Sequence, residues 1–81
     1  MAEERHDDII FNKKVADRIK ELRIKINPIQ AHFARDNYID RQLLNRWENQ
    51  NDKRGISIHS IRRFCNMINI SLKDFFDDER F

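Results

Sequence analysis

The sequence predicts a small all-α domain, and three features indicate this. With 81 residues the chain is long enough for one domain with a modest core, since small domains bury only about 60% of their unfolded surface. It contains one Gly and one Pro, so residues that build hairpin turns are scarce, whereas residues that suit helices are frequent. Apolar residues also recur at helical spacing. We therefore expect five helices packed on one core and no sheet.

The first part of the chain predicts a charged tail and then a long helix. Residues 1–10 are rich in charge, and we expect them to form a flexible tail. From Phe11 onward apolar residues recur at steps of three and four, which is typical of a helix with one buried face; they are Phe11, Val15, Ile19, Leu22 and Ile26. This helix should end near residue 25, because Asn27 and Pro28 have the form of an N-cap and a first helical position.

Two shorter helices are expected next. A second helix over residues 28–35 should place Phe33 and Ala34 in the core. A third helix should begin after Asp40, a favourable N-cap, and run to about residue 50, where a polar stretch stops it.

The last two helices are predicted from their caps. Ser57 should cap a fourth helix, whose expected buried residues are Ile58, Ile61, Phe64, Cys65 and Ile68. Ser71 and Asp74 have the spacing of a capping box, with Asp in place of Glu, and predict a very short fifth helix containing Phe75 and Phe76. Residues 11–76 would then form one domain, followed by a C-terminal tail over residues 77–81.

The charge is unevenly distributed along the chain. Residues 11–64 hold thirteen Lys and Arg against six Asp and Glu, a net charge of +7, whereas residues 1–10 carry −3 and residues 65–81 carry −2. A basic middle region fits a polyanionic partner, although solvated surface charge gives the same pattern. No run approaches the roughly 18 apolar residues of a membrane span, and the start lacks the apolar stretch of a signal peptide. We expect a cytoplasmic protein without membrane contact.

The reactive residues do not form the pattern of an enzyme. His6, His32 and His59 are scattered and lack metal-ligand spacing, so no metal site is expected. Cys65 lies in an apolar helical pattern, which predicts a buried, inert thiol. The chain also lacks paired carboxylates in a plausible cleft, a nucleophile beside a base and a Gly-rich phosphate loop. We expect no catalysis, no catalytic residues and no cofactor.

The predicted third helix has two sharply different sides. Leu43, Leu44 and Trp47 form an apolar side, and the rest of the helix is polar; those residues are Arg41, Gln42, Asn45, Arg46 and Asn49. Arg pairs with guanine, and Gln or Asn with adenine, in the major groove. A solvated helix face is the alternative, but such faces usually mix Glu with Lys, and this one carries no acid.

Glu48 lies where the dipole of the third helix disfavours an anion, so it needs a cation. Arg23 lies four residues after Ile19, at the edge of the buried face of the first helix. We expect Arg23 and Glu48 to form a partly buried ion pair that joins these helices.

Residues 30–48 resemble the helix-turn-helix of the lambda-repressor-like, or Xre-type, transcriptional regulators of bacteria and phages. That family has Gln at the start of its second helix, a large apolar residue and Ala near its end, an apolar residue in the turn, and an apolar pair and Glu in the third helix. The matching residues are Gln30, Phe33, Ala34, Ile39, Leu44, Trp47 and Glu48. Residues 18–23 look like the family's first helix and residues 68–76 like its last turn and fifth helix, so the resemblance runs from about Phe11 to Phe76.

The resemblance implies sequence-specific binding of double-stranded DNA by a repressor-like transcriptional regulator. Its third helix would enter the major groove, with the second helix across the phosphate backbone. The implied base-reading residues are Arg41, Gln42, Asn45 and Arg46. The implied backbone contacts are Gln30, Asn49, Lys53 and Arg54, with Gln30 also steadying Gln42.

The chain departs from the family in two places. Tyr38 stands where the family usually has Gly, and Tyr is strained at positive φ, so either Asn37 takes that conformation or the turn is reshaped. The loop over residues 49–56 is slightly longer than usual and lacks its Pro.

The C-terminal aromatic residues suggest two kinds of partner other than DNA, a second copy of the chain and a different protein. A homodimer would double the few contacts that one small domain makes with DNA, and the fifth helix with its aromatic residues Phe75, Phe76 and Phe81 is the expected interface. Alternatively, Phe75 or Phe76 fills the core. A second function class is a protein-interaction module, such as an antitoxin or an anti-repressor partner, that uses the same aromatic residues.

Overall fold

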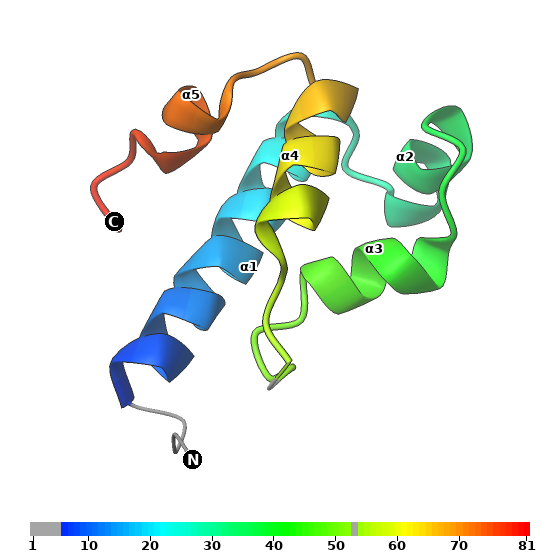
Figure 1. Cartoon of the computed structure of the whole chain (residues 1–81). Coiled ribbons are helices and arrows are strands. Elements are labelled where there is room, and N and C mark those ends of the chain that lie inside the picture. Colours follow the sequence, from blue (N-terminus) through cyan, green and yellow to red (C-terminus); the bar gives the residue numbers. More distant parts are fainter. Residues whose placement is uncertain (1–5, 53) are drawn as a thin grey trace.

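The computed structural model describes residues 6–52 and 54–81, and these residues form five helices and no strand. The helices are α1 (His6–Ile26), α2 (Gln30–Asp36), α3 (Arg41–Trp47), α4 (Ile58–Met67) and α5 (Leu72–Phe76). Figure 1 shows the long α1 and the shorter α4 side by side, with α2 and α3 on one side of this pair and α5 on the other. The all-α class predicted from the sequence is confirmed.

The first helix is longer than the apolar pattern predicts. It begins at His6 rather than Phe11, so the prediction of a flexible tail over residues 1–10 is wrong for its second half. Asp7 and Asp8 lie in the first turn, where carboxylates complement the positive end of the helix dipole. These two carboxylates therefore stabilise helical residues that precede the part of α1 packed in the core.

The core forms around the ring of Phe64 on α4. Phe33 of α2, Trp47 of α3 and Phe75 of α5 surround it, with ring centroids 6.0, 6.4 and 6.4 Å from that of Phe64. The other buried apolar residues are Val15, Ala16, Ile19, Ala34, Leu44, Ile61 and Cys65. The buried thiol is as predicted, and burial raises the pKa of Cys65. Each helix thus contributes to a single core.

Three residues that the periodicity placed on a buried face are exposed; they are Phe11, Ile26 and Ile58. Leu22 and Ile68 are half-buried at the border of the core. A helix end projects past its neighbours, so a residue there can match the apolar period without meeting a packing partner. Periodicity predicted the centre of each helix better than its ends.

Most of the predicted caps are present. Asp40 accepts a hydrogen bond from the backbone N–H of Gln42 at 2.8 Å. Ser57 accepts one from Ser60 at 3.1 Å, and Ser71 accepts one from Asp74 at 3.0 Å. These bonds satisfy N–H groups that have no partner within the helix.

Two predicted helix limits are corrected. Asn27 accepts a hydrogen bond from the N–H of Ile29, and α2 begins at Gln30, two residues later than Pro28. The third helix ends at Trp47 instead of near residue 50.

The turn between α2 and α3 places Tyr38 in the left-handed conformation, with φ of 57°. Its N–H donates to the carbonyl of Arg35 and that of Ile39 donates to the carbonyl of Ala34, which is a Schellman motif. Asn37 has φ of −106°, so the alternative in which Asn37 takes the left-handed position is wrong. Ile39 is partly buried against the core, and this fixes the preceding residue, Tyr38, in the strained position.

The C-terminal segment, residues 77–81, which the sequence predicted only as a tail, is packed on α1. The guanidinium of Arg80 binds Asp17 at 2.8 Å and Glu21 at 2.7 Å. Arg18 of α1 donates to the carbonyl of Phe75 at 2.9 Å and to Asp78 at 3.2 Å. The hydrogen bond from Arg80 holds the pKa of Glu21 below its ordinary value.

The expected ion pair between Arg23 and Glu48 is present and buried. Nε and one terminal nitrogen of Arg23 donate to the two carboxylate oxygens of Glu48, at 2.9 and 2.7 Å, and each side chain is 5% exposed. The other terminal nitrogen donates to the carbonyls of Asn27 and Pro28, at 3.2 and 2.9 Å. One guanidinium thus joins α1, the loop before α2 and the end of α3.

We predict that Glu48→Gln lowers the free energy of unfolding by about 3 to 5 kcal/mol, because the guanidinium of Arg23 stays buried without a counter-charge. Chemical denaturation would measure this. Glu21→Gln is the control, since the Glu21 side chain is 39% exposed, against 5% for Glu48, and the loss of its charge should cost at most about 1 kcal/mol. Equal stability of Glu48→Gln and the wild type would contradict the prediction.

We predict that Tyr38→Gly stabilises the protein by about 0.5 to 1 kcal/mol, because relief of the left-handed strain exceeds the entropy that Gly adds to the unfolded chain. Tyr38 is 93% exposed, so little packing is lost. Tyr38→Ile should destabilise, since a β-branched residue tolerates positive φ poorly. Thermal melts of both variants in parallel check the prediction, which is wrong if Gly is the less stable replacement.

Candidate nucleic-acid interface

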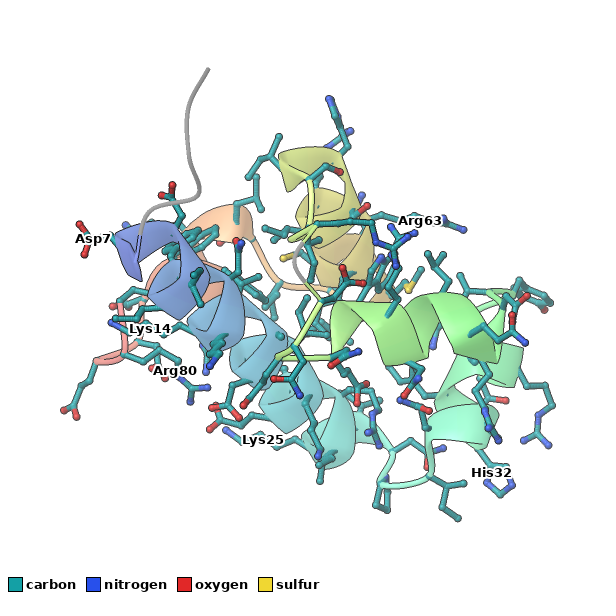
Figure 2. All side chains as sticks on the ribbon, turned by 90° about the horizontal axis from the view of Figure 1, so that it is seen from below. Asp7, Lys14, Lys25, His32, Arg63 and Arg80 are labelled. Atoms are coloured by element: carbon teal, nitrogen blue, oxygen red, sulfur yellow. The ribbon has the colours of Figure 1, made fainter. Side chains whose placement is uncertain are left out.

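The exposed side of α3 carries four polar side chains in two adjacent pairs. They are Arg41, Gln42, Asn45 and Arg46, and all four are exposed because Leu44 and Trp47 fix the opposite side of the helix in the core. Among the residues that the structure describes, none of these four side chains has a hydrogen-bond partner or an ion-pair partner within the domain. Figure 2, seen from below, shows α3 lying between α4 and α2. The helix therefore presents hydrogen-bond donors to solvent that have no partner among the described residues of the domain.

Three of these residues, Gln42, Asn45 and Arg46, line an open groove of about 470 Å³ on the molecular surface. The lining residues are Asp40, Gln42, Leu43, Asn45, Arg46, Asn49, Asp52 and Arg54. The helix face itself carries no acid, as predicted, but the fold adds two carboxylates at the edge of the groove. Asp40 comes from the N-cap of α3 and Asp52 from the loop after it, and sequence spacing gave no sign that Asp52 would lie there.

Asp52 is paired with Arg54 in the loop after α3. Nε of Arg54 donates to one carboxylate oxygen at 3.0 Å and a terminal nitrogen donates to the other at 2.8 Å. This contact, together with the backbone N–H of Arg54, lowers the pKa of Asp52 to about 2. The positive charge of Arg54 is thus largely compensated, although its side chain is 68% exposed.

Gln30 has a different partner from the one expected. Its Nε2 donates to Glu48 at 3.3 Å, and among the hydrogen bonds of the described residues none joins Gln30 to Gln42. The amide thus supports the buried ion pair at the end of α3, so the expectation that it steadies Gln42 is wrong. Because Gln30 is half-buried, it is also less available to a phosphate than a fully exposed side chain.

The remaining predicted backbone contacts lie after α3. Asn49 is exposed at the edge of the groove, where its side chain accepts the N–H of Asn51 at 2.9 Å. Lys53 falls outside the described residues.

Tyr38 is a candidate that the sequence reasoning treated only as a departure from a pattern. Its ring lies almost fully in solvent three residues before α3 begins, so it stands beside the start of the polar helix. The apolar Ile39 was the available signal, because in a Schellman motif the residue before such a contact takes the left-handed conformation.

The chemistry of this surface is that of hydrogen bonding. Arg46 and Arg41 offer forked donors, and Gln42 and Asn45 offer a paired donor and acceptor, which are the groups that recognise base edges. Within residues 6–52 and 54–81, no three His, Cys, Asp or Glu side chains gather as a metal site would require. No helix in the same ranges is both long and apolar enough to cross a membrane.

Comparison of the chain with protein-family models, curated proteins and solved structures found no match.

We predict that Arg54→Gln raises the pKa of Asp52 from about 2 towards its ordinary value of 3.8. In the wild type the lowered pKa makes the charged form of Asp52 stabilising above about pH 4, and this contribution is lost as the pH falls towards 2. The carboxyl carbon shift of Asp52 in an NMR titration reports the change. Arg80→Gln is the control, which should raise the pKa of Asp78 and leave that of Asp52 unchanged.

Proposed function

We propose that this chain has the lambda-repressor-like arrangement of five helices and binds double-stranded DNA as a transcriptional regulator. In this proposal α3 enters the major groove and α2 lies across the phosphate backbone. The observation that carries the proposal is the outer side of α3, where Arg41, Gln42, Asn45 and Arg46 are exposed and lack partners within the described fold.

The mechanism follows from the geometry of α3. Residues 41 and 45, like residues 42 and 46, are four apart, so each pair lies one helical turn apart on the same side. Two adjacent rows of donors can follow the edges of successive base pairs, with Arg at guanine and Gln or Asn at adenine. The buried Arg23–Glu48 pair holds the C-terminal end of α3 to α1, so the helix enters the groove as part of a rigid body.

The charge distribution also supports the proposal. The net charge of +7 over residues 11–64 attracts phosphate at long range, while base-edge contacts supply the sequence preference. Asp40 and Asp52 lie at the edge of the groove and repel phosphate. Arg54 compensates Asp52, and the Asp40 carboxylate accepts the N–H of Gln42, so neither carboxylate pairs with the side chains of Gln42, Asn45 and Arg46 in the groove.

The second candidate, a protein-interaction module that uses the C-terminal aromatic residues, has less support. Phe75 is completely buried, and Phe76 stacks against Phe11 with centroids 6.4 Å apart. Of the three residues expected to contact a partner, only Phe81 is substantially exposed.

Selection of bound sequences from a random pool of duplexes tests the proposal. We expect a defined sequence preference and an affinity that falls steeply with salt, because displaced counterions set the slope. A pool that stays random after repeated rounds, with binding absent at low salt, would overturn the proposal.

We predict that Gln42→Ala and Arg46→Ala each weaken binding to the selected duplex by about 1 to 3 kcal/mol and relax the preference at one base pair. Titration of selected and scrambled duplexes at several salt concentrations measures both effects. Lys73→Ala on α5 is a matched surface control, since Lys73 is exposed on a helix distant from α3 in Figure 1. If the ratio of selected to scrambled affinity is unchanged in both α3 variants, α3 does not read the sequence.

A further inference from the structure

One side of α1 is covered along its second half and open along its first half. Asp7, Lys14 and Glu21 are spaced by seven residues and share this side with Ile10, Phe11, Asp17 and Arg18. The C-terminal segment covers the second half, because Arg80 binds Asp17 and Glu21 and Asp78 binds Arg18.

The open half is apolar at its centre. Ile10 is 39% exposed and Phe11 is 47% exposed. Phe81 lies beside them, 39% exposed, with its ring centroid 6.0 Å from that of Phe11. We call Ile10, Phe11 and Phe81 the α1 patch.

Opposite charges stand at the two ends of the α1 patch. Asp7 lies one turn before it and Lys14 one turn after it, and Figure 2 shows both on the same side of the molecule. Within the described part of the chain, neither Asp7 nor Lys14 has an oppositely charged partner within ion-pair distance. The arrangement from Asp7 to Lys14 is acidic, apolar and basic in that order.

The acidic, apolar and basic residues from Asp7 to Lys14 are complementary to the same residues of a second helix that runs in the opposite direction. If two copies of α1 lie antiparallel with Ile10 of one opposite Phe11 of the other, the same register sets Asp7 of each opposite Lys14 of the other. A parallel pair would instead place like charges together, which is unfavourable. A two-fold axis between the copies repeats each contact, as isologous dimers require.

We propose that a second copy of this chain docks on the α1 patch through an antiparallel α1–α1 contact, closed by two Asp7–Lys14 ion pairs. The patch replaces the expected interface on α5, because Phe75 is buried there and only Phe81 of the expected aromatic residues contributes. The contact joins two short helical segments, so the dimer is weak, with a dissociation constant in the micromolar range.

The contact leaves the exposed side of α3 free. Gly55 in the loop after α3 lies so close to Asn12 of α1 that a Cβ atom added to Gly55 would be 3.0 Å from the Asn12 side chain. The loop therefore packs against another side of α1. Gln50 in the same loop donates to Asp17 at 3.3 Å, so the loop also reaches the second half of the patch side, which the C-terminal segment covers. The polar side of α3 is not part of the proposed contact, so docking does not depend on whether α3 binds DNA.

Charge reversal tests the proposal without any DNA. We expect the wild type to reach a monomer–dimer equilibrium in sedimentation experiments from micromolar to millimolar concentration. Asp7→Lys and Lys14→Asp should each weaken the dimer by about tenfold, because each reversal places two like-charged pairs in the contact. The double variant, Asp7→Lys with Lys14→Asp, should restore the affinity to within about threefold of the wild type, because the pairs re-form with exchanged signs.

The neighbouring residues Asp8 and Lys13 provide matched controls. Both are exposed, as is Asp7, whereas Lys14 is half-buried. Each control is rotated by about 100° around α1 from its neighbour, which places it off the contact. Asp8→Lys and Lys13→Asp should leave the dimer unchanged, while circular dichroism shows that all variants keep their helix. A wild type that stays monomeric overturns the proposal, and so does a dimer that Lys13→Asp and Lys14→Asp weaken equally.

Discussion

The fold of this protein depends on the buried guanidinium of Arg23. It meets the carboxylate of Glu48 through two hydrogen bonds and binds the two carbonyls of the loop before α2. Desolvation makes an isolated charge costly at this depth, so the pair is satisfied only when α1, this loop and the end of α3 are all in place. The contact adds directional specificity to a core whose apolar packing alone is compatible with several helix orientations.

The orientation of α3 follows from this constraint. With Trp47 packed on Phe64 and Glu48 held by Arg23, the last residue of the helix and its C-cap are fixed, and the polar side faces outward. At the other end Asp40 caps the first turn of α3, and Tyr38, in the left-handed conformation, turns the chain from α2 into α3. A seven-residue helix is too short to be stable by itself, so its position and its existence both depend on these contacts.

A second, more exposed network fixes the C-terminal segment. Arg18 and Arg80 meet three carboxylates at the surface of α1, where water screens each pair and the individual contributions are small. Their effect is positional, because they bring Phe81 beside Phe11 and cover only the second half of that side of α1. The proposed DNA-reading surface and the proposed docking surface therefore lie on different helices, and each is shaped by a different ionic network.

The sequence by itself determined the helical class, three of the caps, most of the core and the Arg23–Glu48 pair. These depend on local rules: apolar spacing, the preference of Ser and Asp for N-caps, and the need of an anion at a helix C-terminus for a cation. It also determined which side of α3 is exposed, since Leu44 and Trp47 can only be buried together. The tertiary structure decided the left-handed Tyr38, the partner of Gln30 and the place of Asp52 beside the groove. The last two depend on contacts between residues far apart in the chain, and the first depends on the packing of Ile39 against the core. The extension of α1 to His6 follows from the local carboxylates Asp7 and Asp8, which a pattern of apolar residues does not include.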